Sequence, residues 1–311
     1  MSPFDAFRYD GKRVIVVGGA SGIGAAAARL AQDAGAEVVV MDLADVTLPG
    51  VKAIRMNLAE RASIDAAVDE CGGVVDALFS CAGVADGTPG IERINFVGHR
   101  HLIERMLSKG MLRRGSAICL VSSLGGVGWE SSLRPLSKLL DISDFDAAAR
   151  WFVQRGQANY TMTKLAIGAY VAREAFPLLK RGIRINAISP GATDTPLAQA
   201  NKEIWLGFGT DYREAVGIKP FTPTEQAYPL VFLCSDAAAA ITGTIVHSDA
   251  GWLSSAITRS FPSATFFAKV LLGRSAWARL LRNVGMRLSN RTGRLSARAW
   301  NRRTTTVASR S

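Results

Sequence analysis

The sequence predicts an α/β fold: a doubly wound, Rossmann-like parallel sheet in a single domain, with a helical insertion and a basic C-terminal extension. Short apolar runs rich in β-branched residues alternate with segments of helical periodicity along most of the 311 residues. A glycine-rich turn follows the first of these runs and opens the first helix. Apolar residues make up 48% of the chain and charged residues 20%, which is typical of a protein with one large buried core.

The first strand, at residues 13–17, leads into the clearest binding motif of the chain. A glycine-rich turn between a strand and a helix lets a pyrophosphate approach the backbone, with the helix N-terminus facing it. The predicted phosphate-binding residues are Gly18, Ser21, Gly22, Ile23 and Gly24. The alternative is a tight turn that binds nothing.

The second strand, at residues 37–42, ends on Asp42, 18 residues after Gly24. That spacing is close to the roughly 20 residues expected for the acid that binds the adenosine ribose. A carboxylate there repels a 2′-phosphate, and neither Ser21 nor Leu43 is basic. Asp42 therefore favours NAD over NADP, unless it is a plain loop residue.

The remaining elements continue the alternation. Helices are predicted at 63–71, 91–107, 160–179 and 223–234, and strands at 74–80, 116–121, 182–189 and 243–248. Ligands of such sheets bind at the carboxyl ends of the strands. Within the third helix of this series, Tyr160 and Lys164 lie four residues apart and share one face. A phenol beside an ammonium can exchange protons with a carbonyl or alcohol, although a solvated helix pair is the simpler alternative.

Together these motifs resemble the short-chain dehydrogenase/reductase family from about Gly11 to Trp252. The shared motifs are Gly18-x-x-x-Gly22-x-Gly24, Cys81-Ala82-Gly83, Asn95, Ser123, Tyr160-x-x-x-Lys164 and Pro190-Gly191. The resemblance implies an NAD-dependent oxidoreductase that transfers a hydride between nicotinamide and a hydrophobic secondary alcohol or ketone, with a hydroxysteroid as one candidate. The alternative is a non-catalytic NAD-binding regulatory or membrane-associated scaffold of the same fold.

The resemblance also implies a role for each site residue. Tyr160 exchanges the proton, and Lys164 lowers its pKa and binds the nicotinamide ribose. Ser123 binds the substrate oxygen, and Asn95 supports a water-linked proton relay; Ser123 could instead be a strand-end hydroxyl, and Asn95 a helix cap or kink. Further cofactor contacts are implied for Asn57, Leu58, Cys81, Ala82, Gly83, Pro190, Gly191, Thr193 and Thr195.

Three positions depart from the family pattern. Val17 stands where a threonine is usual, Asn57 where an aspartate contacts adenine, and Cys81 where an asparagine precedes Ala-Gly. An amide can still bind adenine, whereas Val17 and Cys81 remove polar contacts that brace the central strands. We expect these two substitutions to affect the affinity for the cofactor more than the catalytic chemistry.

The stretch between Ser123 and Tyr160 contains 36 residues, an insertion at about 124–157. Its apolar residues at partly helical spacing are Leu133, Leu136, Leu139, Leu140, Phe145, Trp151 and Phe152. The insertion is similar to that of the bacterial 3α-hydroxysteroid dehydrogenase/carbonyl reductase branch, in which it forms the dimer contact. A homodimer or homotetramer is expected, unless the insertion packs on its own subunit. Residues 197–221 are expected to form an apolar lid over a hydrophobic substrate.

Basic residues are concentrated in the C-terminal extension. Residues 256–311 carry 12 Lys and Arg and no acid, so residues 1–255, the predicted catalytic domain, have a net charge of −1 within the total of +11. Residues 263–288 mix arginine with aromatic and aliphatic residues at helical intervals. This pattern fits an anionic membrane surface or a helix docked on the enzyme; nucleic acid is a poorer partner.

No secretory signal or membrane span is apparent, and the four cysteines suggest neither a disulfide nor a metal site. The scattered histidines His99, His101 and His247 are interpreted as structural or surface residues. A cytoplasmic protein, peripheral at the membrane if the extension binds lipid, is expected.

Overall fold

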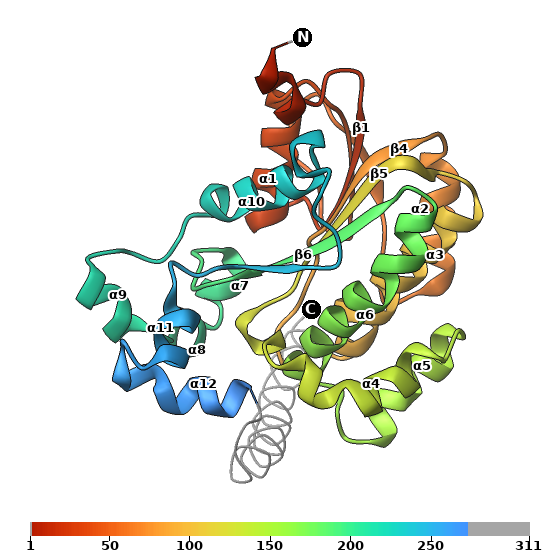
Figure 1. The fold of residues 1–311 in the computed structure, drawn as a ribbon. Coiled ribbons are helices and arrows are strands. Elements are labelled where there is room, and N and C mark those ends of the chain that lie inside the picture. The colour runs from red at the N-terminus through yellow and green to blue at the C-terminus, as the bar shows by residue number, and fades with distance from the viewer. Residues whose placement is uncertain (1, 273–311) are drawn as a thin grey trace, which may run out of the picture.

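Seven parallel strands form the central sheet of the computed structural model, which describes residues 2–272 (Figure 1). The strands are β1 (Arg13–Val17), β2 (Glu37–Asp42), β3 (Lys52–Arg55), β4 (Val75–Ser80), β5 (Leu112–Val121), β6 (Arg184–Pro190) and β7 (Ile245–Ser248). Their order is β3-β2-β1-β4-β5-β6-β7, which confirms the predicted doubly wound sheet. The strand order reverses between β1 and β4, where such sheets bind their ligands.

Helices cover both faces of the sheet (Figure 1). Helices α1 (Gly22–Asp33) and α10 (Pro223–Cys234) pack on one face, and α2 (Arg61–Cys71), α3 (Gly98–Ser108) and α6 (Tyr160–Lys180) on the other. The strands are apolar on both sides for this reason: Val14 and Val16 belong to one core cluster, and Ile15 and Val17 to the other.

Strand β3 is the one strand that the sequence analysis missed. It lies at the edge of the sheet, beside β2, and only Ile54 of its four residues is buried. Three polar or small residues around one apolar residue give no strand pattern. The predicted helix at 91–107 is also interrupted, because residues Arg93–Val97 form the π-helical turn η2 before α3 begins.

The insertion forms α4 (Leu133–Leu140) and α5 (Phe145–Gln154), after the short 3₁₀ turns η3 (Leu124–Gly126) and η4 (Trp129–Ser132). Most of its apolar side chains are buried in the core of their own chain: Leu136, Leu139, Phe145, Trp151 and Phe152. These side chains of the insertion therefore pack within their own chain. The expected dimer contact through this insertion stays a prediction. It was expected because the apolar side chains need to be buried, and most of them are already buried within the chain.

The lid and the first part of the C-terminal extension meet at one end of the molecule (Figure 1). The lid contains α7 (Pro196–Gln199), α8 (Lys202–Trp205) and α9 (Thr210–Val216), and the extension contains α11 (Trp252–Thr258), η6 (Pro262–Ala264) and α12 (Thr265–Leu271). The expected boundary at 255/256 falls inside α11, and a separate apolar cluster holds the segment to the body up to Leu272. Most of the amphipathic stretch predicted at 263–288 lies outside the described residues.

Two further 3₁₀ turns complete the described chain, η1 (Pro3–Phe7) and η5 (Asp236–Ala238). None of the helices within residues 2–272 is long and apolar enough to cross a membrane.

Candidate active site

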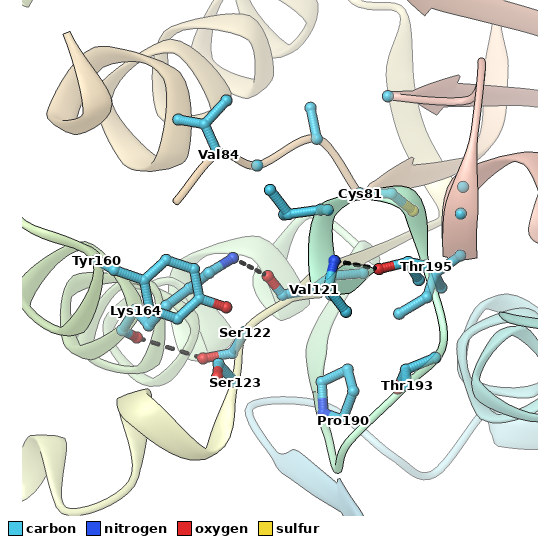
Figure 2. Close-up of a pocket in the computed structure, with 18 of the residues that line it drawn as sticks. Cys81, Val84, Val121, Ser122, Ser123, Tyr160, Lys164, Pro190, Thr193 and Thr195 are labelled. Atoms are coloured by element: carbon cyan, nitrogen blue, oxygen red, sulfur yellow. Dashed lines mark hydrogen bonds between the residues drawn. The ribbon is translucent and has the colours of Figure 1, made fainter. Parts of the chain in front are cut away.

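A cavity of about 620 Å³ opens at the carboxyl ends of the strands (Figure 2). Its walls come from the loops after β1, β2, β4, β5 and β6, from the start of α6 and from the lid. Every predicted catalytic or cofactor-binding residue lines this cavity except Asn95, which lies behind it. The topology therefore brings together residues that are far apart in the sequence.

The loop after β1 is shaped for close backbone approach. Gly18 has a φ of +80°, and a Cβ on it would lie 2.5 Å from the Ala82 backbone nitrogen. A Cβ on Gly24 would lie 2.0 Å from the Gly18 carbonyl oxygen, so the helix could not start so close to the strand with any other residue. The Ser21 side chain makes no capping bond to the first turn of α1. Backbone N–H groups at this helix start can therefore bind a pyrophosphate.

Asp42 is fixed at the end of β2 by two backbone donors. Its Oδ2 accepts from the Ala20 N–H at 2.9 Å, and its Oδ1 from the Ala44 N–H at 3.0 Å. Each carboxylate oxygen can accept a further bond, so the pair can receive both ribose hydroxyls. The neighbouring Leu43 side chain lines the same part of the cavity and carries no charge. Asp42 and Leu43 thus offer hydrogen-bond acceptors and no positive charge at this end of the cavity.

The Asn57 amide is partly committed within its own turn. Its Nδ2 donates to Glu60 Oε1 at 2.7 Å, and its Oδ1 accepts from the Ala59 N–H at 3.0 Å. One Nδ2 hydrogen remains for adenine. Leu58, next along the chain, lines the cavity and is nearly buried.

The backbone braces the two strands at Val17 and Cys81. Both the Cys81 and Ala82 N–H groups donate to the Val17 carbonyl, at 2.8 and 3.0 Å. Burial raises the pKa of the Cys81 thiol well above its usual value, so the thiol is neutral beside the cavity. The missing polar side chains at these positions leave the junction intact.

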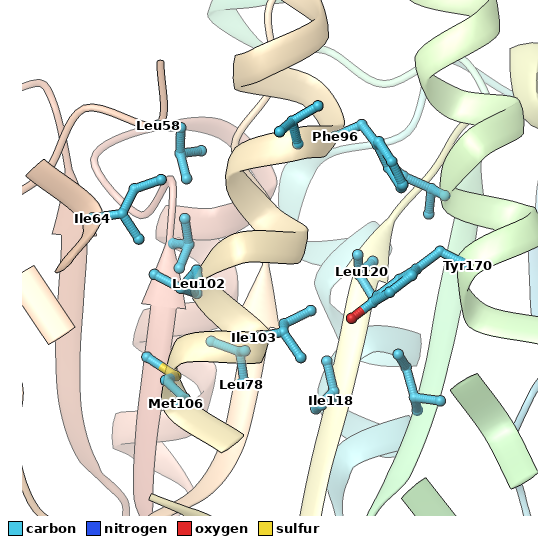
Figure 3. Close-up of a cluster of buried hydrophobic side chains, with 14 of the residues drawn as sticks. Leu58, Ile64, Leu78, Phe96, Leu102, Ile103, Met106, Ile118, Leu120 and Tyr170 are labelled. Atoms are coloured by element: carbon cyan, nitrogen blue, oxygen red, sulfur yellow. The ribbon is translucent and has the colours of Figure 1, made fainter. Parts of the chain in front are cut away.

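Asn95 supports the loop after β4 from its place in the π-helical turn. Its Oδ1 accepts from the Val84 N–H at 2.8 Å, and its Nδ2 donates to the Val84 carbonyl at 2.9 Å. The adjacent Phe96, with Leu102 and Ile103 of α3, anchors this helix in the core (Figure 3). A Cβ on Gly83 would lie 3.6 Å from both Asn95 Oδ1 and Lys164 Nζ, so the amide and the ammonium flank the same short segment.

The two serines after β5 point to different places. The buried Ser122 hydroxyl donates to the Lys164 carbonyl at 3.3 Å and thereby holds α6 to the sheet. Ser123 lines the cavity on the Tyr160 side, and its Oγ also accepts from the Gly125 N–H at 3.2 Å (Figure 2). Ser123, and not Ser122, is therefore placed to meet a substrate oxygen.

Tyr160 begins α6, and burial, more than Lys164, sets its pKa in this structure. Burial raises the pKa of Tyr160 to about 12, a hydrogen bond with Ser123 offsets part of this rise, and the Asp86 carboxylate adds to it. Lys164 Nζ lies 5.4 Å from the centroid of the Tyr160 ring and donates to the Val121 carbonyl at 2.8 Å. The ammonium thus lies beside the Tyr160 ring and is held by the end of β5. Tyr160 is a protonated phenol at neutral pH.

Lys164 is itself strongly affected by its surroundings. Burial lowers its pKa from 10.5 to about 8, and the nearby Cys81 thiol offsets part of this shift. The side chain is 3% exposed, and its ammonium lies between the end of β5 and the loop after β4. It can donate further hydrogen bonds into the cavity.

Three further residues support the site and were not assigned to it from the sequence. Asp86 Oδ1 accepts from the Tyr160 N–H at 2.6 Å and so fixes the start of α6. His99, buried and interpreted correctly as structural, bonds Ser80 Oγ and the Ala82 carbonyl; burial lowers its pKa to about 4. The Trp205 ring of the lid lies 4.9 Å from the Tyr160 ring, centroid to centroid.

Two family models match the chain in succession. The model described as short chain dehydrogenase matches residues 12–132, and the one described as enoyl-(acyl carrier protein) reductase matches residues 143–253. Together they span the glycine-rich loop, the serines after β5 and the Tyr160–Lys164 pair. Both matches end before the η6 and α12 segment.

Individual proteins agree with these models. The chain is 30% identical over 272 residues to 2,5-dichloro-2,5-cyclohexadiene-1,4-diol dehydrogenase LinX of Sphingobium indicum, covering 79% of this chain and 98% of that one. It is 27% identical over 254 residues to the 3-alpha-hydroxysteroid dehydrogenase/carbonyl reductase of Comamonas testosteroni, covering 76% and 95%. The solved 3-alpha-hydroxysteroid dehydrogenase of Pseudomonas sp. B-0831, complexed with NADH, superposes with a TM-score of 0.64 at 27% identity, covering 80% and 99%.

Proposed function

The chain belongs to the short-chain dehydrogenase/reductase family of oxidoreductases, and from this premise we propose that it transfers a hydride between NAD and a hydrophobic cyclic secondary alcohol or ketone. The family binds a nicotinamide cofactor and acts on alcohol or carbonyl groups. The choice of NAD, the apolar substrate and the preferred direction are the parts that we propose.

The observation that carries the proposal is the placement of Ser123, Tyr160 and Lys164 along one wall of the cavity. Two hydroxyls and a buried ammonium lie close together there (Figure 2). All four residues of the predicted catalytic set are present, including Asn95 behind the wall. A scaffold would have no use for a desolvated lysine at this place, and no observation supports the non-catalytic alternative.

The chain's own residues would bind the cofactor along the strand ends. The loop after β1 would bind the pyrophosphate, Asp42 the adenosine ribose, and Lys164 the nicotinamide ribose. Pro190, Gly191, Thr193 and Thr195 line the opposite wall after β6, against which the nicotinamide end would lie. When bound, the cofactor supplies the hydride, or receives it in the reverse direction.

The proton is the part of the chemistry that the protein supplies. Ser123 would donate a hydrogen bond to the carbonyl oxygen and hold it beside the Tyr160 hydroxyl. As the hydride adds to the carbonyl carbon, the Tyr160 phenol gives its proton to the oxygen, and the product is the alcohol. Because Tyr160 is protonated at neutral pH, its resting state is ready for ketone reduction. The Lys164 ammonium would stabilise the phenolate that forms.

Residues at one end of the cavity support the proposed preference for NAD, and residues at the other end support the proposed substrate class. Asp42 and the uncharged Leu43 favour a free 2′-hydroxyl, and the similar Pseudomonas enzyme was solved with NADH. At the other end the walls are apolar and include Leu124, Trp205 and Phe208. Some of the similar proteins are named for cyclic alcohols, among them a 3α-hydroxysteroid and a cyclohexadienediol.

A screen of cyclic ketones and alcohols, followed by nicotinamide absorbance with NADH and NADPH in parallel, tests the proposal. For any substrate found, Tyr160→Phe should lower kcat about 10²–10⁴-fold, the usual contribution of general acid–base catalysis, and leave the Kd for NADH nearly unchanged. Tyr228→Phe is the matched control, because Tyr228 is 57% exposed and does not line the cavity. Full activity of Tyr160→Phe would refute the mechanism.

A further inference from the structure

We propose that residues 261–272, which lie beyond the family match, form a wall of the substrate end of the cavity and limit the size of the apolar group accepted beside the reacting carbon. This inference rests on the proposed function and deepens it. It makes Leu271 a specificity-determining residue contributed by a segment that the family model does not contain.

Leu271, at the end of α12, lines the cavity. Helix α12 contacts η3, whose Leu124 and Gly125 line the same cavity and directly follow Ser123. Because Ser123 would hold the substrate oxygen, a group attached to the reacting carbon would extend toward these residues. Leu271 therefore borders the space into which the substrate's bulk must fit.

The segment is fixed against the loop that carries Ser123. Gly128, in the same loop, has a φ of +77°, and a Cβ on it would lie 2.3 Å from the Leu271 carbonyl oxygen and 2.8 Å from the Leu272 Cα. The contact is thus backbone against backbone, and it leaves no room for the end of α12 to move inward. Val127 and Ala268 are buried in the same apolar cluster.

Aromatic contacts join the segment to the lid. The Phe208 ring lies 4.8 Å from the Trp252 ring and 5.7 Å from the Phe267 ring, centroid to centroid. Tyr212 of α9 lies edge-on to Phe261 at 5.1 Å. Because Phe208 also lines the cavity, residues 261–272 set the position of the lid as well as one wall.

The chemistry of this wall selects the substrate class. Leu124, Phe208 and Leu271 carry no charge and no hydrogen-bonding side chain, and the Trp205 ring covers Tyr160 beside them. Charged or hydroxylated groups would lose their hydration there without gaining a partner. The site should therefore accept a ketone or alcohol with an apolar ring or alkyl substituent, up to a size that Leu271 sets.

The test compares two ketones that differ only in bulk, cyclohexanone and 4-tert-butylcyclohexanone, with NADH in the full chain. Leu271→Ala should raise the kcat/KM ratio of the bulky to the small ketone about tenfold, and Leu271→Trp should lower it by a similar factor, since a few methylene groups in an apolar pocket are worth about 10–200-fold. Lys269→Ala, an exposed change on the same helix, should leave the ratio at the wild-type value. The Kd for NADH should stay constant throughout.

Unchanged ratios in both Leu271 variants, with native circular dichroism, would overturn the inference. Leu271→Phe replaces the tryptophan variant if the latter does not fold. The rise in melting temperature that 4-tert-butylcyclohexanone gives the NADH-loaded protein is measured in parallel. If the rise differs between the wild type and the Leu271 variants while the wild type reduces neither ketone, the proposed function is wrong, but the inference that Leu271 lines the binding site is supported. A wild type that neither binds nor reduces either ketone overturns both.

Discussion

Replacing Lys164 with methionine should stabilise the cofactor-free protein at pH 7 while it removes activity. Burial lowers the pKa of Lys164 from 10.5 to about 8, which corresponds to a cost on the order of 3 kcal/mol for keeping the ammonium charged. Methionine has a similar length and no charge. It loses the 2.8 Å bond from Nζ to the Val121 carbonyl, which is worth about 1 kcal/mol. The expected net gain at pH 7 is about 2 kcal/mol.

The gain should disappear at high pH, and this dependence is specific to the buried ammonium. Between pH 8 and 10.5 the folded protein has released the Lys164 proton, whereas the unfolded chain still holds it. The unfolded state then binds more protons, so wild-type stability rises with pH across this window relative to Lys164→Met. Near pH 10 the neutral amine still donates to Val121, and the wild type should equal or exceed the variant. Tyr160 titrates in both proteins and cancels in the difference.

Guanidinium unfolding at pH 7, 8.5 and 10, followed by tryptophan fluorescence and circular dichroism, measures the difference. Lys180→Met is the matched control, because Lys180 is an exposed lysine in the same helix, and its effect should not change with pH in this way. If Lys164→Met is less stable than the wild type at pH 7, or if its effect is the same at pH 7 and pH 10, the reasoning from burial is refuted.

Three further predictions concern the cofactor, the assembly and the C-terminal extension. The wild type should bind NAD with a much lower Kd than NADP. Asp42→Ala should reduce the ratio of the two Kd values about tenfold, in line with the 1–3 kcal/mol of a charged hydrogen bond. Equal Kd values in the wild type would contradict this. If the insertion forms an oligomer contact, its exposed Leu133 and Val153, 47% and 58% accessible, should carry it, and changing both to aspartate should lower the mass in solution; an unchanged mass speaks against the contact. A chain ending at Leu272 should keep its turnover but lose salt-sensitive binding to phosphatidylserine vesicles, because residues 273–311 carry ten arginines and no acid, each basic residue adding about 1 kcal/mol. A full chain that ignores such vesicles would disprove the membrane prediction.

The strand ends of the site could be predicted because each is marked by local chemistry. Gly18 and Gly24 are needed where two backbones approach within the reach of a Cβ, and Asp42 ends an apolar strand. The role of each of these residues depends on its position relative to its own strand and helix, so the spacing in the sequence is enough to predict where it lies in the fold. The parallel sheet then brings them together without further information.

The electrostatics of Tyr160 could not be predicted in the same way. Spacing says that Tyr160 and Lys164 share a helix face, but it does not say where the ammonium points. The Val121 carbonyl, on a strand 43 residues earlier in the chain, accepts a hydrogen bond from Nζ and so fixes the position of the ammonium. Burial of the phenol, which is a property of the whole fold, then raises its pKa. Both effects come from tertiary contacts that no local pattern encodes.

The docking of residues 256–272 on the body was one of two alternatives that the sequence left open. Three of its buried contact residues are small, Ala256, Ala264 and Ala268, and they lie beside the aromatic contacts of Phe261 and Phe267. Alanine lets helices approach closely and contributes little to an apolar pattern, so the packing face looks weak in the sequence. Gly128 is the matching feature on the body, because a Cβ at this position would collide with the backbone of Leu271 and Leu272. A short, closely packed interface of this kind can control a substrate wall, because a change in the Leu271 side chain alters the cavity directly.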